Sequence, residues 1–508
     1  MLWKNTASYE YGMTPFVRQC FVTAAVGLNI ISFGCTIGFP AILLPQLTDS
    51  KILLSKEQES WYAAILPLSV LVGNFVTPPI MDGFGRKVTH YALTMISLVG
   101  WCITIIANSF EALIIGRFWQ GIAAGLLTTL RSVLIGECTS PEHRGAFLTT
   151  VSISQAFGVF FVHLVGSFLS WQRTAIICVF VPFVSLIMVA YTPKSPSWLL
   201  KKGRYDECKQ VFRWLRGSDA EDELSQMIQA RLAYKRAEIK NPSFTRHWFI
   251  NLISIIRKRE FYKPVILMVI SNILMHISGA STFSPYATLI LGLLMGTDAN
   301  IYFWMVFLDT NRFVTNFLAI YIINRVKRRT MVLATGVLSV ASHIAIACYV
   351  YFKQNGWDYE GIWLPALLIN LQFLAVGTGM VPMPQVIGGE IFPLEYRSIG
   401  GTISMAAGVG IMFVALKTFP NLTQSIGLEG TYGLYAVILL VNLIALMLWL
   451  PETKGKTLQQ IEDELRGDTF GDGEILEEKS LLCEEELLLC EEHNESRCSS
   501  PTDIQNFQ

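Results

Sequence analysis

The chain has 508 residues, of which 52% are hydrophobic and only 15% are charged, and its mean hydropathy is +0.44. Ordinary soluble domains carry about 25% charged residues, so this composition excludes that class and indicates lipid as the main solvent. The 39 basic and 39 acidic side chains cancel, which argues against a nucleic-acid partner.

The apolar residues form about twelve runs, each near the ~20 residues that a helix needs to cross a bilayer. In chain order the runs are 18–46, 60–80, 88–108, 111–135, 147–169, 173–191, 263–294, 299–323, 330–352, 361–388, 398–418 and 431–450. The sequence therefore predicts an all-α membrane protein. Lys and Arg collect in alternate connections, so we expect both termini to be cytoplasmic.

The longest polar stretch between spans divides the runs into two sets of six. The predicted parts are a cytoplasmic N-terminus at 1–17, a six-helix half at 18–193, a cytoplasmic helical insert at 194–262, a second six-helix half at 263–457 and an acidic, disordered cytoplasmic tail at 458–508. Within the insert, 205–215 and 220–240 have the pattern of amphipathic helices. A disordered linker is the alternative, but Val211, Phe212 and Leu215 offer an apolar face.

Three loop signatures occur twice, in the same order. They are 82–87 and 324–329, Glu137 with Arg144 and Glu390 with Arg397, and 193–199 and 451–457, at offsets of 242, 253 and 258 residues. Such a repeat is typical of transporters that work by alternating access. We expect charge clusters that latch helix ends, formed by Asp82, Arg86, Glu137, Arg144, Glu390 and Arg397. The alternative, that the cations only set orientation, leaves the paired acids unexplained.

These motifs together resemble one family. The loop at 82–87, Gly116 and Arg117 with Gly121 and Gly125, the Glu137 and Arg144 pair, and the letters PETKG at 451–455 resemble the sugar porter family of the major facilitator superfamily. The similarity extends from residue 21 to 457, and 38–47 further resembles the facilitative trehalose transporter branch. The resemblance implies the major facilitator fold, with sugar bound near mid-membrane between the halves.

The resemblance also implies which residues contact substrate. A family glutamine of span 5 falls at Gln155, and the span-7 motif falls on 275–281, where serine and glycine remain but the amides are replaced. Span 10 lacks the family tryptophan, and an asparagine expected in span 11 falls at Gly408. The candidate substrate-binding residues are Gln155, Met275, His276, Ser281, Arg312 and Met383. Methionines in such places predict a softer, more adaptable pocket.

Ionisable residues inside the spans carry further hypotheses, because charge at membrane depth is costly. Asp309 and Arg312 lie three residues apart on one predicted helix face, so they can neutralise each other as a structural pair, or Arg312 can contact sugar. His276 is either a substrate contact or a packed histidine, whereas His163 and His343 are interpreted as structural.

Proton-coupled members of the family carry a carboxylate in span 1, where this chain has Pro40. No Asp or Glu occurs between Tyr11 and Leu47, which favours uniport, although Asp309 or His276 leaves proton coupling open. We therefore predict a plasma-membrane facilitative carrier of a hexose, a trehalose-like disaccharide or a polyol. The alternatives are a non-transporting nutrient sensor and a carrier of another small polar solute.

Neither a nucleophile, a metal nor a cofactor motif is present in the sequence, so we expect no enzyme and no cofactor. In the tail, two leucine pairs each follow an acidic residue by four positions and resemble sorting signals read by clathrin adaptors. These are Leu481 with Leu482 and Leu488 with Leu489. A transient amphipathic helix without a partner is the alternative.

Overall fold

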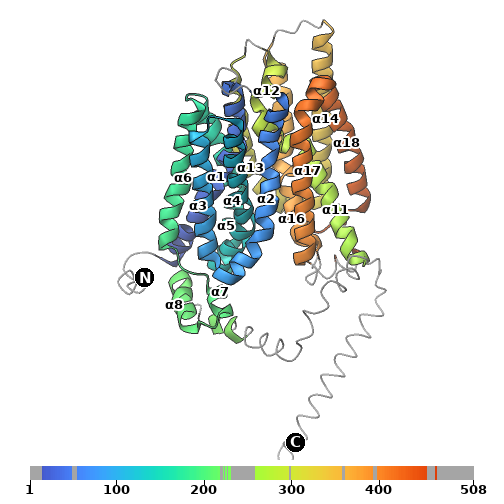
Figure 1. Cartoon of the computed structure of the whole chain (residues 1–508). Helices are drawn as coiled ribbons and strands as arrows, with labels where there is room; N and C mark the ends of the chain where they lie inside the picture. The colour runs from blue at the N-terminus through green and yellow to red at the C-terminus, as the bar shows by residue number, and fades with distance from the viewer. Residues whose placement is uncertain are drawn as a thin grey trace, which may run out of the picture.

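The structure, a computed structural model, describes residues 14–47, 54–217, 221, 223–225, 227–229, 258–296, 299–356, 361–392, 397–454, 461 and 464–465. Within these residues it contains twelve helices that are long and apolar enough to cross a membrane. They stand side by side as one bundle (Figure 1). The predicted all-α membrane fold with twelve spans is confirmed.

The first half of the bundle consists of six uninterrupted helices. They are α1 (Pro15–Leu47), α2 (Lys56–Phe84), α3 (Arg86–Ile106), α4 (Phe110–Cys138), α5 (Pro141–Gly166) and α6 (Trp171–Tyr191). Two short helices, α7 (Pro196–Lys201) and α8 (Tyr205–Arg216), follow at the lower end of the bundle in Figure 1. We call this end of the molecule the α8 end and the opposite end the far end.

In the second half, two of the six spans are broken. Span 7 is composed of α11 (Arg259–Met275), the π-helical turn η4 (His276–Ala280) and α12 (Phe283–Met295). Span 10 is composed of α15 (Trp363–Ala375), the π-helical turn η5 (Val376–Met380) and α16 (Pro382–Ile391). The continuous spans are α13 (Ile301–Arg325), α14 (Arg328–Gln354), α17 (Arg397–Ser425) and α18 (Gly427–Trp449).

Glycines bring two helix pairs of the first half into backbone contact. A Cβ added at Gly34 of α1 would lie 2.3 Å from the carbonyl oxygen of Gln155 on α5, and one at Gly158 would lie 2.2 Å from that of Ile31. Gly73 of α2 and Gly125 of α4 meet in the same way. Helices in lipid associate through such close packing, because burial from water no longer drives them together.

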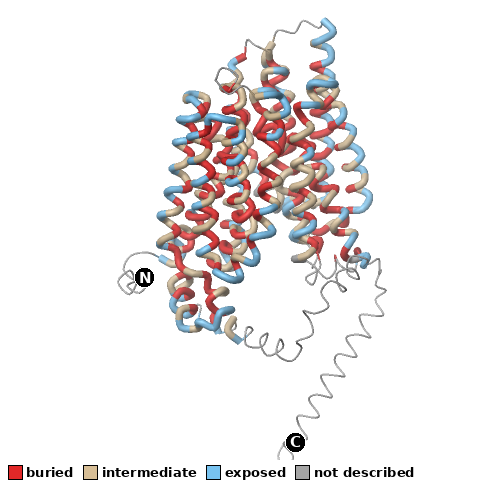
Figure 2. Tube along the Cα trace, viewed as in Figure 1, coloured by how far each residue is buried: buried red, intermediate tan, exposed pale blue. Residues whose placement is uncertain are grey.

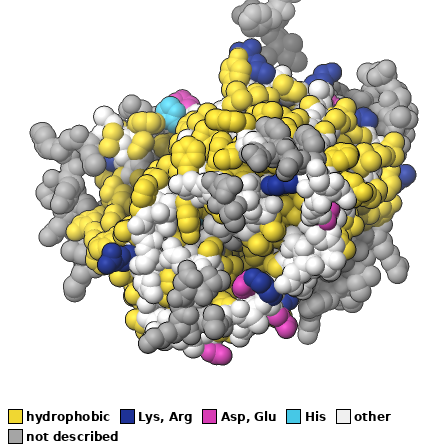
Figure 3. All heavy atoms as spheres, turned by 90° about the horizontal axis from the view of Figure 1, so that it is seen from above, with side chains coloured by type: hydrophobic (Ala, Val, Ile, Leu, Met, Phe, Trp, Pro, Cys, Tyr) yellow, Lys and Arg dark blue, Asp and Glu magenta, His cyan; other side chains and the backbone are white. Residues whose placement is uncertain are grey.

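The outer surface of the bundle is suited to lipid. Large apolar side chains remain exposed there, among them Phe75, Ile106, Phe180 and Leu448. The buried residues run through the middle of the bundle, and the exposed ones lie mainly on its outside (Figure 2). Seen from above, hydrophobic side chains cover much of the far end, with few charged side chains among them (Figure 3).

The insert begins with helices that pack onto the first half. In α8, Cys208, Val211, Phe212 and Leu215 are buried, which confirms the helix predicted at 205–215. Gln19 of α1 donates to the carbonyl oxygen of Leu215 at 3.0 Å. Most of the second predicted helix, 220–240, lies outside the described residues, but its described residues, 221, 223–225 and 227–229, are helical. The tail beyond residue 465 also lies outside the described residues.

The two halves contact each other toward the far end. Thr288 of α12 donates to the carbonyl oxygen of Ala41 on α1 at 3.1 Å, and the Lys417 ammonium of α17 donates to Ser60 Oγ of α2 at 2.8 Å. The same ammonium lies 4.4 Å from the centre of the Trp61 ring. In this arrangement, side chains from both halves close the far end.

Candidate functional site

The breaks in spans 7 and 10 lie at the segments predicted to contact substrate, and the two breaks pack against each other. Gly279 in η4 has φ 96°, a conformation that favours glycine. Buried Gln372 of α15 donates to the carbonyl oxygen of Ser278 at 3.0 Å, so it satisfies a backbone group near the break. Gln372 was not predicted from the sequence, although an amide inside an apolar run is itself a signal.

The π-turn brings together two predicted substrate-binding residues. His276 Nδ1 and Ser281 Oγ lie 2.5 Å apart, and both side chains are buried. In a regular α-helix, residues five apart point about 140° away from each other. The break therefore creates a polar pair that continuous helix geometry would not allow.

Arg312 and Asp309 do not pair with each other, so the predicted ion pair is wrong. Arg312 Nη1 donates to Ser284 Oγ of α12 at 2.9 Å, and Asp309 Oδ2 contacts His163 Nδ1 of α5. The two residues share a face of α13, but each side chain has a partner on a different neighbouring helix. His163, interpreted as structural, thereby joins the two halves.

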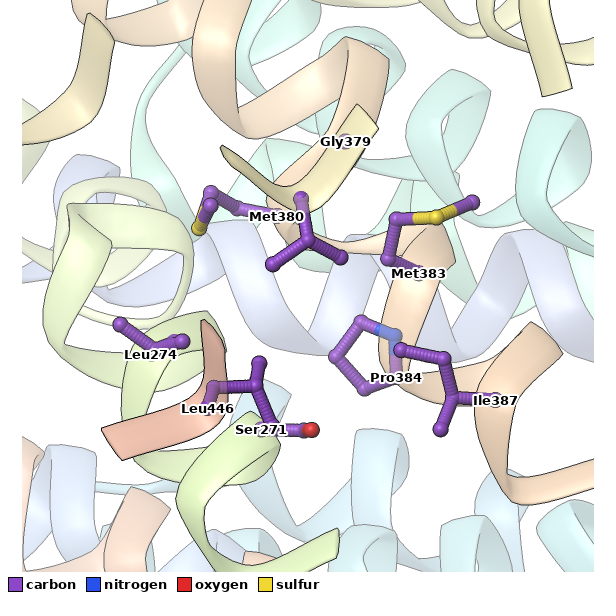
Figure 4. Close-up of a pocket in the computed structure, with 9 residues that line it drawn as sticks. Ser271, Leu274, Gly379, Met380, Met383, Pro384, Ile387 and Leu446 are labelled. Carbon is purple, nitrogen blue, oxygen red and sulfur yellow. The ribbon is translucent and has the colours of Figure 1, made fainter. Parts of the chain in front are cut away.

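The other candidate residues lie in more than one place. Met383 is buried and lines a cavity of about 10 Å³, roughly the room of one water molecule, with Ser271, Leu274 and Met380 (Figure 4). Apart from the Ser271 hydroxyl, the side chains lining this cavity are apolar. Met275 is half-buried at the start of the break, and Gln155 is half-buried on α5. The structure thus brings His276 to Ser281 but does not gather all six residues in one described pocket.

An amide of span 7 occupies the place opposite Gly408 in span 11. A Cβ at Gly408 would lie 3.0 Å from the Asn272 side chain, and Asn272 donates to the carbonyl oxygen of Ser404 at 3.2 Å. The resemblance predicts an asparagine at 408, so the amide at this contact comes from α11 instead. Asn272 was not predicted from the sequence.

Arg117 is fully buried in the first half. It donates to the carbonyl oxygen of Thr36 on α1 and lies 5.1 Å from the centre of the Tyr62 ring. Pro40, at the position where the resemblance places the acid of proton-coupled members, is buried on the same helix α1. The positive charge of Arg117 is thus stabilised by a carbonyl dipole and an aromatic face.

At the α8 end, one acid, one arginine and one hydroxyl form the same cluster in each half. Glu137 accepts hydrogen bonds from Arg86 Nη2 at 2.8 Å and Nε at 3.0 Å, and from Ser195 Oγ at 2.5 Å. Glu390 accepts from Arg328 Nη2 at 3.0 Å and Thr453 Oγ1 at 2.6 Å. The paired positions are separated by 242, 253 and 258 residues, as in the predicted repeat.

Three further residues of the predicted charge clusters, Arg144, Asp82 and Arg397, take different positions relative to these contacts. Glu137 binds Arg86 rather than Arg144, whose Nε is buried without a hydrogen-bond partner among the described residues. Asp82 is more exposed and lies 3.9 Å from Arg86 and 3.0 Å from Lys201. Arg397 begins α17, but its side chain lies outside the described part of the structure. Arg328 was not predicted, although the 242-residue offset maps it onto Arg86.

Glu452 adds a further contact at the α8 end, at the start of α14. Its carboxylate accepts hydrogen bonds from the backbone N–H groups of Arg328 at 3.0 Å and Arg329 at 3.2 Å. Burial raises the pKa of Glu452, but these bonds and one from Lys454 outweigh it and leave the pKa below its usual value. The acid of the 451–455 motif therefore caps a helix whose first N–H groups have no partner within the helix.

Comparison with known proteins gives consistent matches. A family model described as "Sugar (and other) transporter" matches residues 19–465. The facilitated trehalose transporter Tret1 of Bombyx mori is 27% identical over 471 residues, which cover 92% of this chain and 90% of that protein. Tret1 of Polypedilum vanderplanki is 26% identical, with 92% and 91% covered.

Solved structures show the same fold at lower sequence identity. The proton:xylose symporter XylE bound to 6-bromo-6-deoxy-D-glucose has a TM-score of 0.69 at 16% identity, with 89% of this chain and all of that chain covered. The inward-open conformation of XylE from E. coli also has a TM-score of 0.69, with 87% and 99% covered. The matched region spans both halves of the bundle.

Proposed function

Because the chain belongs to the family of sugar (and other) transporters, we propose that it moves a sugar across the membrane by alternating access, as a facilitative uniporter. The family match confirms the resemblance found in the sequence, and the protein is an integral membrane transporter. The two curated relatives described above are named facilitated trehalose transporters. The substrates proposed are a hexose, a trehalose-like disaccharide or a polyol.

The observation that best supports alternating access is the repeated cluster of the α8 end. Each cluster ties the loop between two helices to the end of a third helix and to the segment after the last span, all within one half. The contacts between halves lie toward the far end instead. Because each half is held together by its own cluster and the halves contact each other at one end, the two halves can rock about the middle of the membrane. We propose Asp82, Arg86, Glu137, Arg144, Glu390 and Arg397 as gating residues, together with Arg328.

The proposed substrate site lies between the halves, at the break in span 7. Imidazole, hydroxyl and amide groups both donate and accept hydrogen bonds, as sugar hydroxyls require. The proposed contacts are Gln155, Met275, His276, Ser281, Arg312 and Met383. Methionine at two of these positions supports an adaptable pocket that holds a ring by apolar contact.

Uptake by purified protein in liposomes tests this function. The panel would contain radiolabelled glucose, trehalose and a polyol such as sorbitol, with His276→Ala and Ser281→Ala beside the wild type. We expect at least one solute to equilibrate across the membrane without accumulating, at a rate that protonophores do not change, and both variants to raise KM. The absence of uptake of every solute by folded protein would favour the sensor hypothesis.

The proposal also covers the cellular location of the protein and the partner of its tail. We propose residence in the plasma membrane with both termini cytoplasmic, supported by the Lys and Arg in alternate connections. A clathrin adaptor is proposed as the partner of the two leucine pairs of the tail. All four leucines lie outside the described residues.

A further inference from the structure

A buried histidine and a buried aspartate join the two halves of the bundle. His163 of α5 is 0% exposed and Asp309 of α13 is 1% exposed. His163 Nδ1 contacts Asp309 Oδ2, and His163 Nε2 lies 3.0 Å from the carbonyl oxygen of Gly38 on α1. The contact lies toward the far end, where side chains from both halves meet.

The hydrogen-bond partners determine how many protons this contact holds. A carbonyl oxygen can only accept, so His163 Nε2 must carry a hydrogen and donate it to Gly38. If His163 were neutral and Asp309 ionised, the lone pair of Nδ1 would face a carboxylate oxygen that also only accepts. The contact therefore needs one more proton, on Nδ1 or on Oδ2, whichever of the two atoms carries it.

We propose that the His163 and Asp309 contact is a proton-binding site, and that the bound proton holds the two halves together at the far end. One proton from water joins a neutral imidazole and a carboxylate, and no other bond changes. When the far end opens, α5 and α13 separate and each side chain meets water, so the proton leaves at any pH above about 6.5, where an imidazole in water is neutral. The second carboxylate oxygen, Oδ1, is buried without a hydrogen-bond partner among the described residues, so the contact with His163 is the only hydrogen bond of this carboxyl group there.

Other ionisable groups lie on the helices packed against α5 and α13. Among them are Arg312 on α13, Cys35 on α1, Cys178 and the exposed Arg173 on α6, Tyr286 on α12 and Arg117 on α4. α15 and η5 carry none. Arg312 interacts with Asp309 through its charge, but its hydrogen bond goes to Ser284, so it cannot supply the proton between Nδ1 and Oδ2.

The number of protons sets the size of the expected effect. An imidazole in water loses its proton above about pH 6.5, so above that pH the closed far end binds one proton that the open one does not, and the closed-to-open ratio falls as pH rises further. For one proton the change is at most about tenfold per pH unit. Acid therefore favours the arrangement with the far end closed.

A distance measurement between the halves tests the proposal without any substrate, so its failure is distinct from failure of the proposed sugar transport. Spin labels at Phe168→Cys on the first half and Phe303→Cys on the second would report far-end opening in the full chain, reconstituted in nanodiscs. Both positions are exposed, at 81% and 59%. The background replaces the half-exposed Cys20, the exposed Cys102 and Cys348, and the three cysteines beyond residue 465 by serine.

Distances between the two spin labels would be measured by double electron–electron resonance from pH 5.5 to 8.5, on the wild-type background and on three variants. Asp309→Asn keeps the shape and supplies an N–H that donates to Nδ1 without a proton, so we expect a predominantly closed far end at every pH. His163→Asn with Asp309→Asn pairs two amides and should also lose the pH response. His90→Asn, which alters a buried histidine inside the first half, should retain it.

The expected result is a wild-type closed fraction that falls with pH and an Asp309→Asn closed fraction that does not. A wild-type distance distribution independent of pH would overturn the proposal. An Asp309→Asn response that equals the wild type would overturn it as well. If the Asp309→Asn protein is not monodisperse, the double variant His163→Asn with Asp309→Asn replaces it in this comparison. A closed fraction independent of pH then supports the proposal, and a response equal to the wild type overturns it.

Discussion

The cluster around Glu137 allows a quantitative prediction. Arg86→Ala removes two hydrogen bonds to a carboxylate and leaves Glu137 with Ser195 as its remaining partner in the cluster. A charged hydrogen bond contributes about 1.5–3 kcal/mol, and an unpaired, largely buried acid adds a further cost. The arrangement that contains the cluster should lose about 3 kcal/mol or more, which changes its population roughly 150-fold or more relative to the other arrangement.

The assay compares initial uptake rates with surface abundance in the same cells. We expect Arg86→Ala to reduce the rate per surface molecule at least tenfold while its abundance stays within about twofold of wild type. Arg328→Ala should act alike, because Arg328 binds Glu390 in the equivalent cluster. The two effects should add when the variants are combined, since the clusters share no residue.

A control is the ion pair of Lys56 and Glu59 at the start of α2, 3.1 Å apart, in which the Lys56 side chain is 58% exposed and the Glu59 side chain 17% exposed. Surface ion pairs contribute about 0–1 kcal/mol, so Lys56→Ala should leave the rate unchanged. Wild-type rates per molecule in both Arg86→Ala and Arg328→Ala would refute the gating role. A loss of abundance as large as the loss of rate would show that the clusters serve folding instead.

Three further predictions concern stability and sorting. Gly279→Ala should lower the midpoint of thermal unfolding, because φ is 96° and the new Cβ would lie 2.4 Å from Gln372 Nε2, whereas Gly401→Ala, with open space around its Cβ, should not. Hydrogen bonds hold the pKa of Glu452 below its usual value, so the stabilisation by this acid is present above the unfolded pKa of about 4.3 and is lost as pH falls. Glu452→Gln should therefore unfold at a lower temperature than wild type at pH 7 and at the same temperature at strongly acidic pH. Alanine at all four tail leucines should raise the surface fraction of a tagged chain without changing transport per surface molecule, and an unchanged fraction would exclude the sorting role. The substituted residues are Leu481, Leu482, Leu488 and Leu489.

The spans could be predicted because lipid imposes one requirement, a long apolar run, which is visible in the order of residues. The repeat could be predicted because equivalent loops keep the same spacing, and contacts at Arg86 and Arg328 follow that spacing. The 242-residue offset of the first loop, applied to Arg86, identifies Arg328 from the sequence alone. Local sequence thus determines where the helices form, and comparison of the two halves determines the clusters.

The hydrogen-bond partners of the buried side chains could not be predicted. Spacing along the sequence shows which residues share a helix face, but it does not show which neighbouring helix lies opposite that face. Asp309 and Arg312 share a face of α13, yet α5 and α12 supply their partners. The contact of His276 with Ser281 depends on a π-turn, and helical periodicity assumes that none exists. The Ser278-Gly279 pair in the sequence marked this segment as a candidate substrate contact, but the sequence did not give the geometry of the break.

The glycine contacts within the first half differ in kind from the contacts between halves. Where Gly34 meets Gly158, and Gly73 meets Gly125, backbone lies on backbone, and no side chain is present that could adopt another rotamer. Between the halves, side chains such as Lys417 and Thr288 make the contacts and can exchange partners. Substitutions can therefore retune how readily the halves separate, and so the speed of the carrier, while the paired helices inside the half keep one fixed geometry.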